Sequence, residues 1–240
     1  MERRAPPPPA LEADLLVPGL LHEIRHPLSG IKAGLQLLGA SLGPRLTSLD
    51  EWGLVTDQVR RLEETLLTFQ ELADPSLDRA PALFAPEPVV LEALALLRFR
   101  LRPLGDRFAL LVEGPVPAAQ GSRRALLHAV TNLTVNALDA VEEAGGPARV
   151  EVRLGRDGHR PQVRVADAGP GIAPAVAGRL FEPRVTSKPP GKGTGLGLFV
   201  ARGQMRASGG EVRLVPPGEP GRRPWATTEF AVELAAGEGP

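Results

Sequence analysis

The segment HEIRHP at residues 22–27 places two imidazoles and a carboxylate within two turns of a predicted helix. An imidazole next to a carboxylate can act as a nucleophile, because the carboxylate orients the ring or accepts its proton. The same letters fit H-E-x-x-H, in which two histidines bind zinc and the glutamate activates water. Zinc would need a third ligand, and the remaining histidines, His128 and His159, lie in a different predicted domain. A zinc hydrolase is therefore an alternative that leaves the motifs described next unexplained.

Two amides four residues apart form a second candidate site. Asn132 and Asn136 fall on one face of a predicted helix, so that their side-chain oxygens can converge. An amide is a neutral oxygen ligand, which suits a magnesium ion that already carries phosphate oxygens and water. Two asparagines at this spacing also occur as surface residues, so the pattern is informative only together with its neighbours in the sequence.

Two glycine-rich segments can bring a bound molecule close to the backbone. The first, DAGPGI at residues 167–172, follows a predicted strand, and the Asp167 carboxylate can accept a hydrogen bond from an exocyclic amine. Its two glycines, Gly169 and Gly171, allow the backbone to approach such a ligand. The second, GKGTGLGL at residues 191–198, precedes a predicted helix, whose N-terminal N–H groups and dipole favour phosphate. Each segment alone would be an ordinary turn.

The histidine segment lies on a predicted helical hairpin. Seven apolar residues from Leu21 to Leu42 are spaced alternately by three and four, the pattern of a helix that packs along another helix. A second run from Trp52 to Ala73 repeats this spacing, with a glycine and a proline between the two runs. Burying one large apolar side chain is worth about 1.5–3 kcal/mol, so two hairpins should pair as a four-helix bundle. We predict a homodimer through residues 11–75; packing of the same seams within one chain is the alternative.

Prolines and a change of pattern divide the chain into regions. Residues 1–10 contain four consecutive prolines and predict a disordered, extended tail, and residues 76–87 are typical of a linker. From residue 88 to residue 240, predicted helices and hairpin-linked strands indicate an α+β fold, a two-layer sandwich. The predicted helices are 88–101, 122–144 and 195–208, and the predicted strands are 107–113, 148–155, 161–167, 210–215 and 227–234.

Composition excludes several classes of protein. The chain has no cysteine, which rules out disulfides, thiolate catalysis and cysteine-bound metals. Its 28 basic and 28 acidic residues give no overall attraction for nucleic acid or for a membrane surface. No run approaches the roughly 18–20 apolar residues of a membrane helix, and the N-terminus lacks a secretory signal. We expect a cytoplasmic protein that binds neither nucleic acid nor membrane.

The amides, the two glycine-rich segments and FEP at residues 181–183 together resemble the N, G1, G2 and F boxes of the histidine kinase ATP-binding domain, part of the GHKL ATPase superfamily. The resemblance covers about residues 85–235 and implies the Bergerat fold, which holds ATP beneath a mobile lid. It implies that Asn136 binds Mg²⁺ beside Asn132, and that Asp167 binds the adenine amino group. The further nucleotide-binding residues that it implies are Gly169 and Gly171 beside the base, and Gly193, Thr194, Gly195, Leu196 and Gly197 around the phosphates.

The lid departs from the family in one respect. Arg184-Val185 stands where an aromatic pair is common after the F box, so the packing of the lid is not fixed by the resemblance. Lys188 and Lys192 fall in the lid, where a cation either neutralises phosphate charge or is simply solvated.

The segment at residues 22–28 resembles the H box of histidine kinases, most nearly the nitrogen-regulation type. It implies that His22 is the phosphoacceptor, and the heptad spacing places His22 just outside the apolar seam. Glu23 would orient the ring or accept its proton, and Pro27 predicts a bend in the helix. His26 stands where many relatives have threonine or asparagine for dephosphorylating the partner, which leaves phosphatase activity open.

The resemblance predicts a histidine kinase of a two-component system. ATP with Mg²⁺ would phosphorylate His22, and the phosphoryl group would pass to an aspartate in the receiver domain of a response regulator. A separate sensor protein, the short tail or a further segment would supply the stimulus. The alternative from another class is a degenerate kinase that acts as a docking scaffold; another GHKL ATPase would have no need of the histidine-bearing hairpin.

Overall fold

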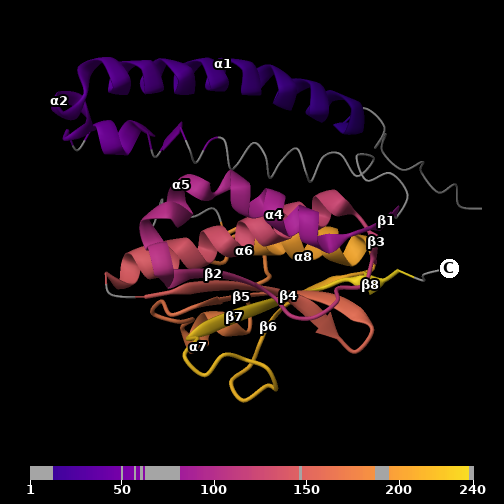
Figure 1. Ribbon diagram of the computed structural model, residues 1–240. Helices are drawn as coiled ribbons and strands as arrows, with labels where there is room; N and C mark the ends of the chain where they lie inside the picture. Colours follow the sequence, from indigo (N-terminus) through magenta and orange to yellow (C-terminus); the bar gives the residue numbers. More distant parts are fainter. Residues whose placement is uncertain are drawn as a thin grey trace, which may run out of the picture. The chain divides into compact units, whose positions relative to one another are not determined.

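The structure is a computed structural model that describes residues 13–49, 51–56, 58–59, 62, 82–145, 148–186 and 195–237. The chain divides into two compact units, residues 1–77 and 78–240 (Figure 1). Across the described part of the chain, no helix is long and apolar enough to cross a lipid bilayer.

The first unit is dominated by one long helix. Helix α1 (Ala13–Leu42) continues through Pro27 and ends before Gly43, whose φ of 56° suits glycine. The short helix α2 (Pro44–Thr47) follows, and a β-carbon built on Gly39 would lie 3.1 Å from Cζ2 of Trp52. The chain therefore reverses direction after α1, at the breakers that the sequence contains. The bend predicted at Pro27 stays a prediction.

The predicted second helix of the hairpin is described only in part. Residues 51–56, 58–59 and 62 are helical, and the rest of the run to Ala73 lies outside the described residues, as do the tail at 1–10 and most of the linker. Several residues of the two apolar seams are exposed, among them Ile31, Leu38, Leu42, Val55 and Leu62. The antiparallel hairpin and its dimer remain predictions.

The second unit is built on a five-stranded sheet of order β2-β4-β5-β7-β6, in which only β2 and β4 run parallel. The predicted hairpin between β4 and β5 is present: Asp157 pairs with Arg160, and Gly158 between them has a φ of 59°. The strands are β2 (Phe108–Val112), β4 (Val150–Asp157), β5 (Arg160–Asp167), β6 (Glu211–Leu214) and β7 (Thr228–Glu233). A smaller sheet joins β1 (Ala82–Phe84), β3 (Ala119–Gly121) and β8 (Ala235–Ala236) in the order β1-β3-β8.

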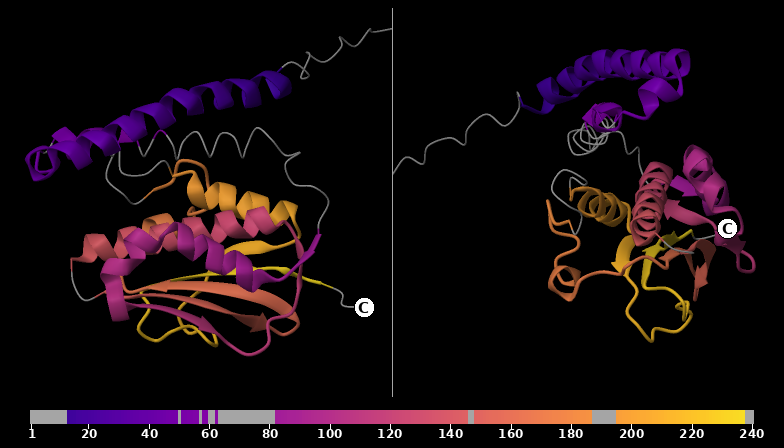
Figure 2. Two further views of the ribbon diagram at one scale, coloured as in Figure 1. Left: turned by 45° about the horizontal axis from the view of Figure 1, so that its top comes forward. Right: turned by 90° about the vertical axis from the view of Figure 1, so that its left-hand side faces the viewer.

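Helices cover one face of the large sheet, with α6 between α4 and α8 (Figure 2). The Ser122 hydroxyl caps α6 by accepting from the backbone N–H of Ala125 at 3.0 Å, and Gly145 ends it in the left-handed conformation. The α+β two-layer architecture predicted from the sequence is confirmed. The helices are α4 (Pro86–Leu96), α5 (Arg98–Leu101), α6 (Arg123–Ala144), α7 (Pro174–Ala177) and α8 (Gly197–Ala207), with a 3₁₀ segment η2 (Arg102–Arg107).

Apolar side chains of α6 and the sheet form one core. Leu126, Leu133 and Leu138 on α6 are fully buried against the inward-facing residues of the strands. Those strand residues include Val150, Val152, Leu154, Val163 and Val232. The helix that carries the two amides is thus held rigidly over the sheet.

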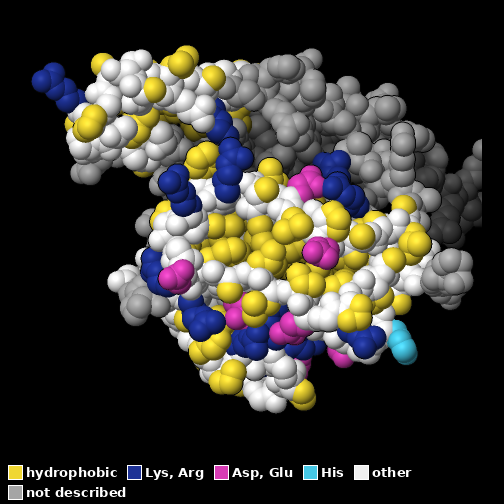
Figure 3. Space-filling view, in the orientation of Figure 1, with side chains coloured by type: hydrophobic (Ala, Val, Ile, Leu, Met, Phe, Trp, Pro, Cys, Tyr) yellow, Lys and Arg dark blue, Asp and Glu magenta, His cyan; other side chains and the backbone are white. Residues whose placement is uncertain are grey.

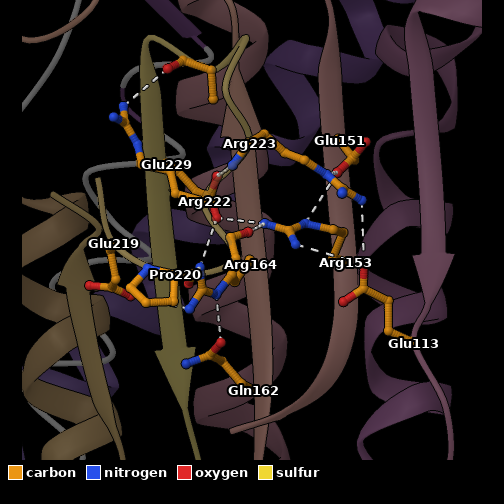
Figure 4. A network of polar contacts seen from close by, with 12 residues as sticks. Glu113, Glu151, Arg153, Gln162, Arg164, Glu219, Pro220, Arg222, Arg223 and Glu229 are labelled. Atoms are coloured by element: carbon orange, nitrogen blue, oxygen red, sulfur yellow. Dashed lines mark hydrogen bonds and ion pairs between the residues drawn. The ribbon is translucent and has the colours of Figure 1, made fainter. Parts of the chain in front are cut away.

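Charged residues occupy the opposite face of the sheet, beneath the loop between β6 and β7 (Figure 4). Glu229 on β7 is wholly buried and accepts from Arg153 at 2.6 Å and from Arg164 at 3.2 Å. Arg153 also donates to the backbone carbonyl of Gly221 in the loop at 2.9 Å. Removing one partner of such a buried pair ordinarily costs about 3–5 kcal/mol, because the other charge is left uncompensated.

The second unit begins earlier than the sequence predicts. Strand β1 and the first turn of α4 fall inside the range 76–87, where a linker is expected. A three-residue strand is too short to show an alternating pattern. Pro86, which suggests a break, instead occupies the first turn of α4, where a missing N–H has no cost.

Candidate functional site

Asn132 and Asn136 meet on one face of α6. The Asn136 amide donates from Nδ2 to Oδ1 of Asn132 at 3.1 Å, and both side chains are half-buried. This contact orients both amides on the same side of the helix, as their spacing predicts. The pair therefore offers oxygen ligands of the kind that accompany a phosphate-bound magnesium ion.

Asp167 ends β5 with its carboxylate buried. Burial raises its pKa to about 6, although hydrogen bonds from the Gly169 backbone and the Thr228 side chain act in the opposite direction. The Gly169 N–H donates to Oδ1 at 2.9 Å. At neutral pH the group is mostly ionised, so it can accept a further hydrogen bond from an amine.

The glycine turn after Asp167 packs against α6 and against the start of β7. A β-carbon on Gly169 would lie 2.6 Å from Cβ of Ala140, so only glycine fits there. Gly171 has a φ of 82°, which also favours glycine. The Thr227 hydroxyl lies within hydrogen-bond distance of the backbone carbonyls of Asp167 and Gly169, at 3.1 and 2.8 Å. Thr227 thereby fixes the shape of the turn.

Helix α8 begins directly beside the two amides. A β-carbon on Gly197, the first residue of α8, would lie 2.1 Å from Nδ2 of Asn132. The N–H groups of the first turn are thus placed near Asn132, where they suit an anion. A second contact ties α8 to α6, because Nδ1 of His128 lies 2.9 Å from Oε1 of Gln204. Burial lowers the pKa of His128 to about 4, so this imidazole is neutral at physiological pH.

The two ends of the predicted lid come together. The N–H of Arg184 donates to the carbonyl of Gly195 at 2.9 Å, and a β-carbon on Gly195 would lie 2.6 Å from the carbonyl carbon of Arg184. Arg184 itself has a φ of 65°, which is unusual for a residue with a side chain. Phe181 is held edge-on to Phe230, with the Arg202 guanidinium 4.3 Å from its ring centre. The described ends of the predicted lid are therefore held together at Arg184 and Gly195, with Arg184-Val185 in place of the expected aromatic pair.

Some predicted site residues lie outside the described residues. Lys188, Lys192, Gly193 and Thr194 are among them, whereas Leu196 directly precedes α8. His22 and Glu23 belong to α1, and nothing is described of their side chains or of His26. Within the described ranges, no three histidine, aspartate or glutamate side chains are grouped so as to hold a metal ion.

Thr227 and Thr228 contact the Asp167 region but are absent from the sequence predictions. Both reach it because β5 pairs antiparallel with β7, which places Thr228 opposite Asp167. Only knowledge of this strand pairing, which joins residues some sixty positions apart, could have predicted the two threonines. No local sequence pattern indicates such a pairing.

Residues 121–236 match the family described as histidine kinase-, DNA gyrase B- and HSP90-like ATPases. The chain is 34% identical over 222 residues to the two-component sensor PprA of Pseudomonas aeruginosa, covering 85% of this chain and 23% of that protein. It is 29% identical over 228 residues to the sensory histidine kinase/phosphatase NtrB of Escherichia coli O157:H7, covering 91% and 61%. The chain thus spans between about a quarter and three fifths of these relatives.

Solved structures with similar folds are also histidine kinases. Full-length ShkA in complex with AMPPNP has a TM-score of 0.58 and 25% identity, over 94% of this chain and 47% of that one. ThkA in complex with the response regulator protein TrrA has a TM-score of 0.61 over 91% of this chain and 60% of that one. At 19% identity, the second likeness concerns the fold alone.

Proposed function

Because the chain belongs to the two-component sensor histidine kinases and carries their ATPase domain, we propose that it is an ATP-dependent kinase that phosphorylates its own His22. The observation that carries the proposal is that two glycine segments pack against α6, Gly197 at Asn132 and Gly169 at Ala140, and that the Gly169 N–H holds the Asp167 carboxylate beside the helix. The same chain carries the HEIRHP segment on α1. The two units supply the two halves of the reaction, nucleotide and acceptor.

The second unit would bind the nucleotide at both ends, the adenine and the phosphates. Asp167 would accept from the adenine amino group, since its carboxylate is buried at the end of β5 and fixed by Gly169. Asn136 would bind Mg²⁺, which neutralises phosphate charge when bound, with Asn132 beside it. Gly197 and the first turn of α8 would receive the phosphates, and Gly195 would close the base of the lid. Lys188 and Lys192 are proposed to contribute positive charge from the lid.

His22 would accept the phosphoryl group on a ring nitrogen. A nitrogen–phosphorus bond forms as the oxygen bridging the β- and γ-phosphates leaves with ADP, and the ring proton passes to Glu23 or water. The protein contributes chiefly position and charge neutralisation, because phosphoryl transfer needs little covalent work from side chains. The phosphoryl group would then pass to a receiver-domain aspartate, a partner class that the ThkA–TrrA complex illustrates for a protein of similar fold.

The acting form is proposed to be a homodimer through residues 11–75. Ile31, Leu38 and Leu42 follow the heptad spacing on α1 and are about half exposed. Three large apolar residues in one stripe would be costly in water, so a second hairpin is the partner that we propose for them. A separate sensor protein would act on this dimer.

Nucleotide binding and turnover together separate a kinase from a scaffold. Calorimetry should show that ATP with Mg²⁺ binds and that GTP does not, since Asp167 needs an amino group where guanine has a carbonyl. Incubation with ATP should then release ADP in step with phosphorylation of the chain. Binding without any phosphorylation would identify the degenerate scaffold, and the absence of binding would overturn the assignment of the site.

A further inference from the structure

One edge of the five-stranded sheet is open and apolar. β2 is an outermost strand, and among the described residues no strand pairs with its outer edge. All five of its residues, FALLV, are apolar, and Leu111 and Val112 are 38% and 45% exposed. Sheets ordinarily guard such an edge with charges, proline or a covering segment, because an unpaired strand attracts another strand.

The opposite edge of the same sheet has this protection. On β6, Glu211 forms ion pairs with Arg202 and Arg206 at 2.7 and 2.8 Å. Arg213 pairs with Glu219 at 2.7 Å and with Glu233 at 2.6 Å. The bare edge at β2 is therefore particular to that strand.

Apolar residues of the helical layer extend the open edge. Leu91 and Leu96 on α4 and Phe99 on α5 are exposed, and Phe99 is 74% exposed. These helices lie on the β2 side of the molecule, since α4 packs on α6 opposite α8, and α8 contacts β6 (Figure 2). Figure 3 shows hydrophobic side chains gathered on the face that carries α4 and β2.

We propose that β2 pairs antiparallel with β2 of a second copy of this chain, about a two-fold axis at Leu110. The N–H of Glu113 donates to the carbonyl of Leu154 at 2.8 Å, toward β4. Phe108, Leu110 and Val112 alternate with Glu113, so their N–H and C=O groups point to the open edge. In this register Phe108 faces Val112 of the second copy, and Leu110 faces its own equivalent. Every backbone N–H and C=O group at the open edge of one β2 strand then faces a hydrogen-bond partner on the β2 strand of the other copy.

The charges flanking β2 fit the same register. Arg107 immediately precedes the strand and Glu113 immediately follows it. Within one copy, Arg107 ends η2 and its Nε donates to the Leu104 carbonyl at 3.3 Å, and Glu113 pairs with Arg223 at 3.3 Å. Antiparallel pairing centred on Leu110 brings Arg107 of each copy opposite Glu113 of the other, which would add a contact between copies. The strand is therefore self-complementary in charge as well as in hydrogen bonding, as a two-fold interface requires.

The helical layer would close over the same axis. A two-fold axis perpendicular to the sheet keeps the helices of both copies on one face, so α4 and α5 meet their equivalents across it. Leu96 and Phe99 would then lose the exposure that they have in a single copy. A strand from an unrelated protein would pair with β2 but would leave these two side chains in water.

Disulfide trapping tests the register directly, because the natural chain has no cysteine. In the full chain, Leu110→Cys should form a disulfide-linked dimer under mild oxidation, since paired residues at the axis have α-carbons about 5.5 Å apart. Leu111→Cys is the matched control: its equivalents would be about 8 Å apart, beyond disulfide range. Equal cross-linking of both variants, or none of Leu110→Cys, would overturn the proposal.

A second design covers the case in which Leu110→Cys folds poorly. Ala109→Cys combined with Leu111→Cys should cross-link, whereas each single variant should not, because these two residues face each other across the axis.

Reversing the flanking charges is a further test. Arg107→Glu or Glu113→Arg alone should weaken the association about tenfold, and the two together should restore it. If the chain with both Arg107→Glu and Glu113→Arg did not regain cross-linking, the proposed register would be excluded. None of these readouts depends on His22, so they test this interface separately from the kinase assignment.

Discussion

Gly197 and Asn132 lie so close that a β-carbon on the glycine would be 2.1 Å from the amide nitrogen. Two segments separated by more than sixty residues are thereby locked together, the amide helix α6 and the first turn of α8. The contact explains a glycine at the start of a helix, where its flexibility is otherwise a cost of up to about 1 kcal/mol.

Gly197→Ala should therefore displace Asn132 and weaken the binding of ATP with Mg²⁺. Calorimetry measures the affinity for ATP with Mg²⁺, and the unfolding temperature of the free protein is measured beside it. Gly203→Ala is the matched control on the same helix, because a β-carbon there meets nothing within 4 Å. That control should keep its affinity and gain up to about 1 kcal/mol of stability. Unchanged affinity in Gly197→Ala would show that the contact has no part in the nucleotide site.

Asp167→Asn should stabilise the free protein and impair nucleotide binding. Burial raises the pKa of Asp167 from 3.8 to about 6, so its favourable effect on folding is present below pH 4 and is lost as the pH rises to 6. At pH 7 the variant escapes this penalty, which is at most about 3 kcal/mol at 1.36 kcal/mol per pKa unit. Chemical unfolding from pH 4 to pH 8 measures the difference between the two proteins.

The same titration predicts the pH dependence of binding. Below about pH 6 the carboxyl of Asp167 is protonated, so the affinity of the wild-type protein for ATP should fall as the pH is lowered. The Asn variant should bind weakly with no such dependence in this range. A wild-type affinity that is constant from pH 7 to pH 5 would argue against Asp167 as the adenine acceptor.

Asn136→Ala should lower the affinity for ATP with Mg²⁺ by about 10- to 100-fold, the cost of losing one contact to a charged group. Its dimer should be unchanged, because the heptad seam lies in the other unit. Titration with and without Mg²⁺ makes the measurement specific to the metal. Glu143→Ala, an exposed position in the last turn of the same helix, is the control that should bind normally.

Much of the second unit follows from local sequence. The Ser122 cap and the apolar spacing predict α6 almost to the residue, and alternation with Asp157-Gly158 predicts the β4–β5 hairpin. The small sheet could not be predicted, because strands of two or three residues carry no periodicity.

Other features depend on long-range pairing. Thr227 and Thr228 reach Asp167 only through the register of β5 with β7. Glu229 and Arg153 have the polar character of exposed strand residues, yet both are buried beneath the β6–β7 loop. Neither arrangement follows from a short stretch of sequence. Residue spacing could therefore predict the amides and glycines of the site, but not the residues that pack around them.

Leu38→Lys should dissociate the proposed hairpin dimer. A charge in the seam of both subunits forfeits the burial of two leucines, about 3–6 kcal/mol, which corresponds to at least 100-fold weaker association. Sedimentation equilibrium measures it in chains that also carry Glu113→Arg, so that association through β2 does not mask the change. Leu37→Lys is the neighbouring control, exposed and outside the heptad spacing, and it should remain dimeric. If both variants behave alike, the seam is not the interface.

The central claim is tested most directly by labelling with γ-³²P-ATP and Mg²⁺ in wild-type protein, His22→Gln and His26→Gln. Wild type should take up label in a form that is labile in acid and stable in base, as expected for phosphohistidine. His22→Gln should take up none, and His26→Gln should still be labelled. Label that persists in His22→Gln, or that is stable in acid, would contradict the account.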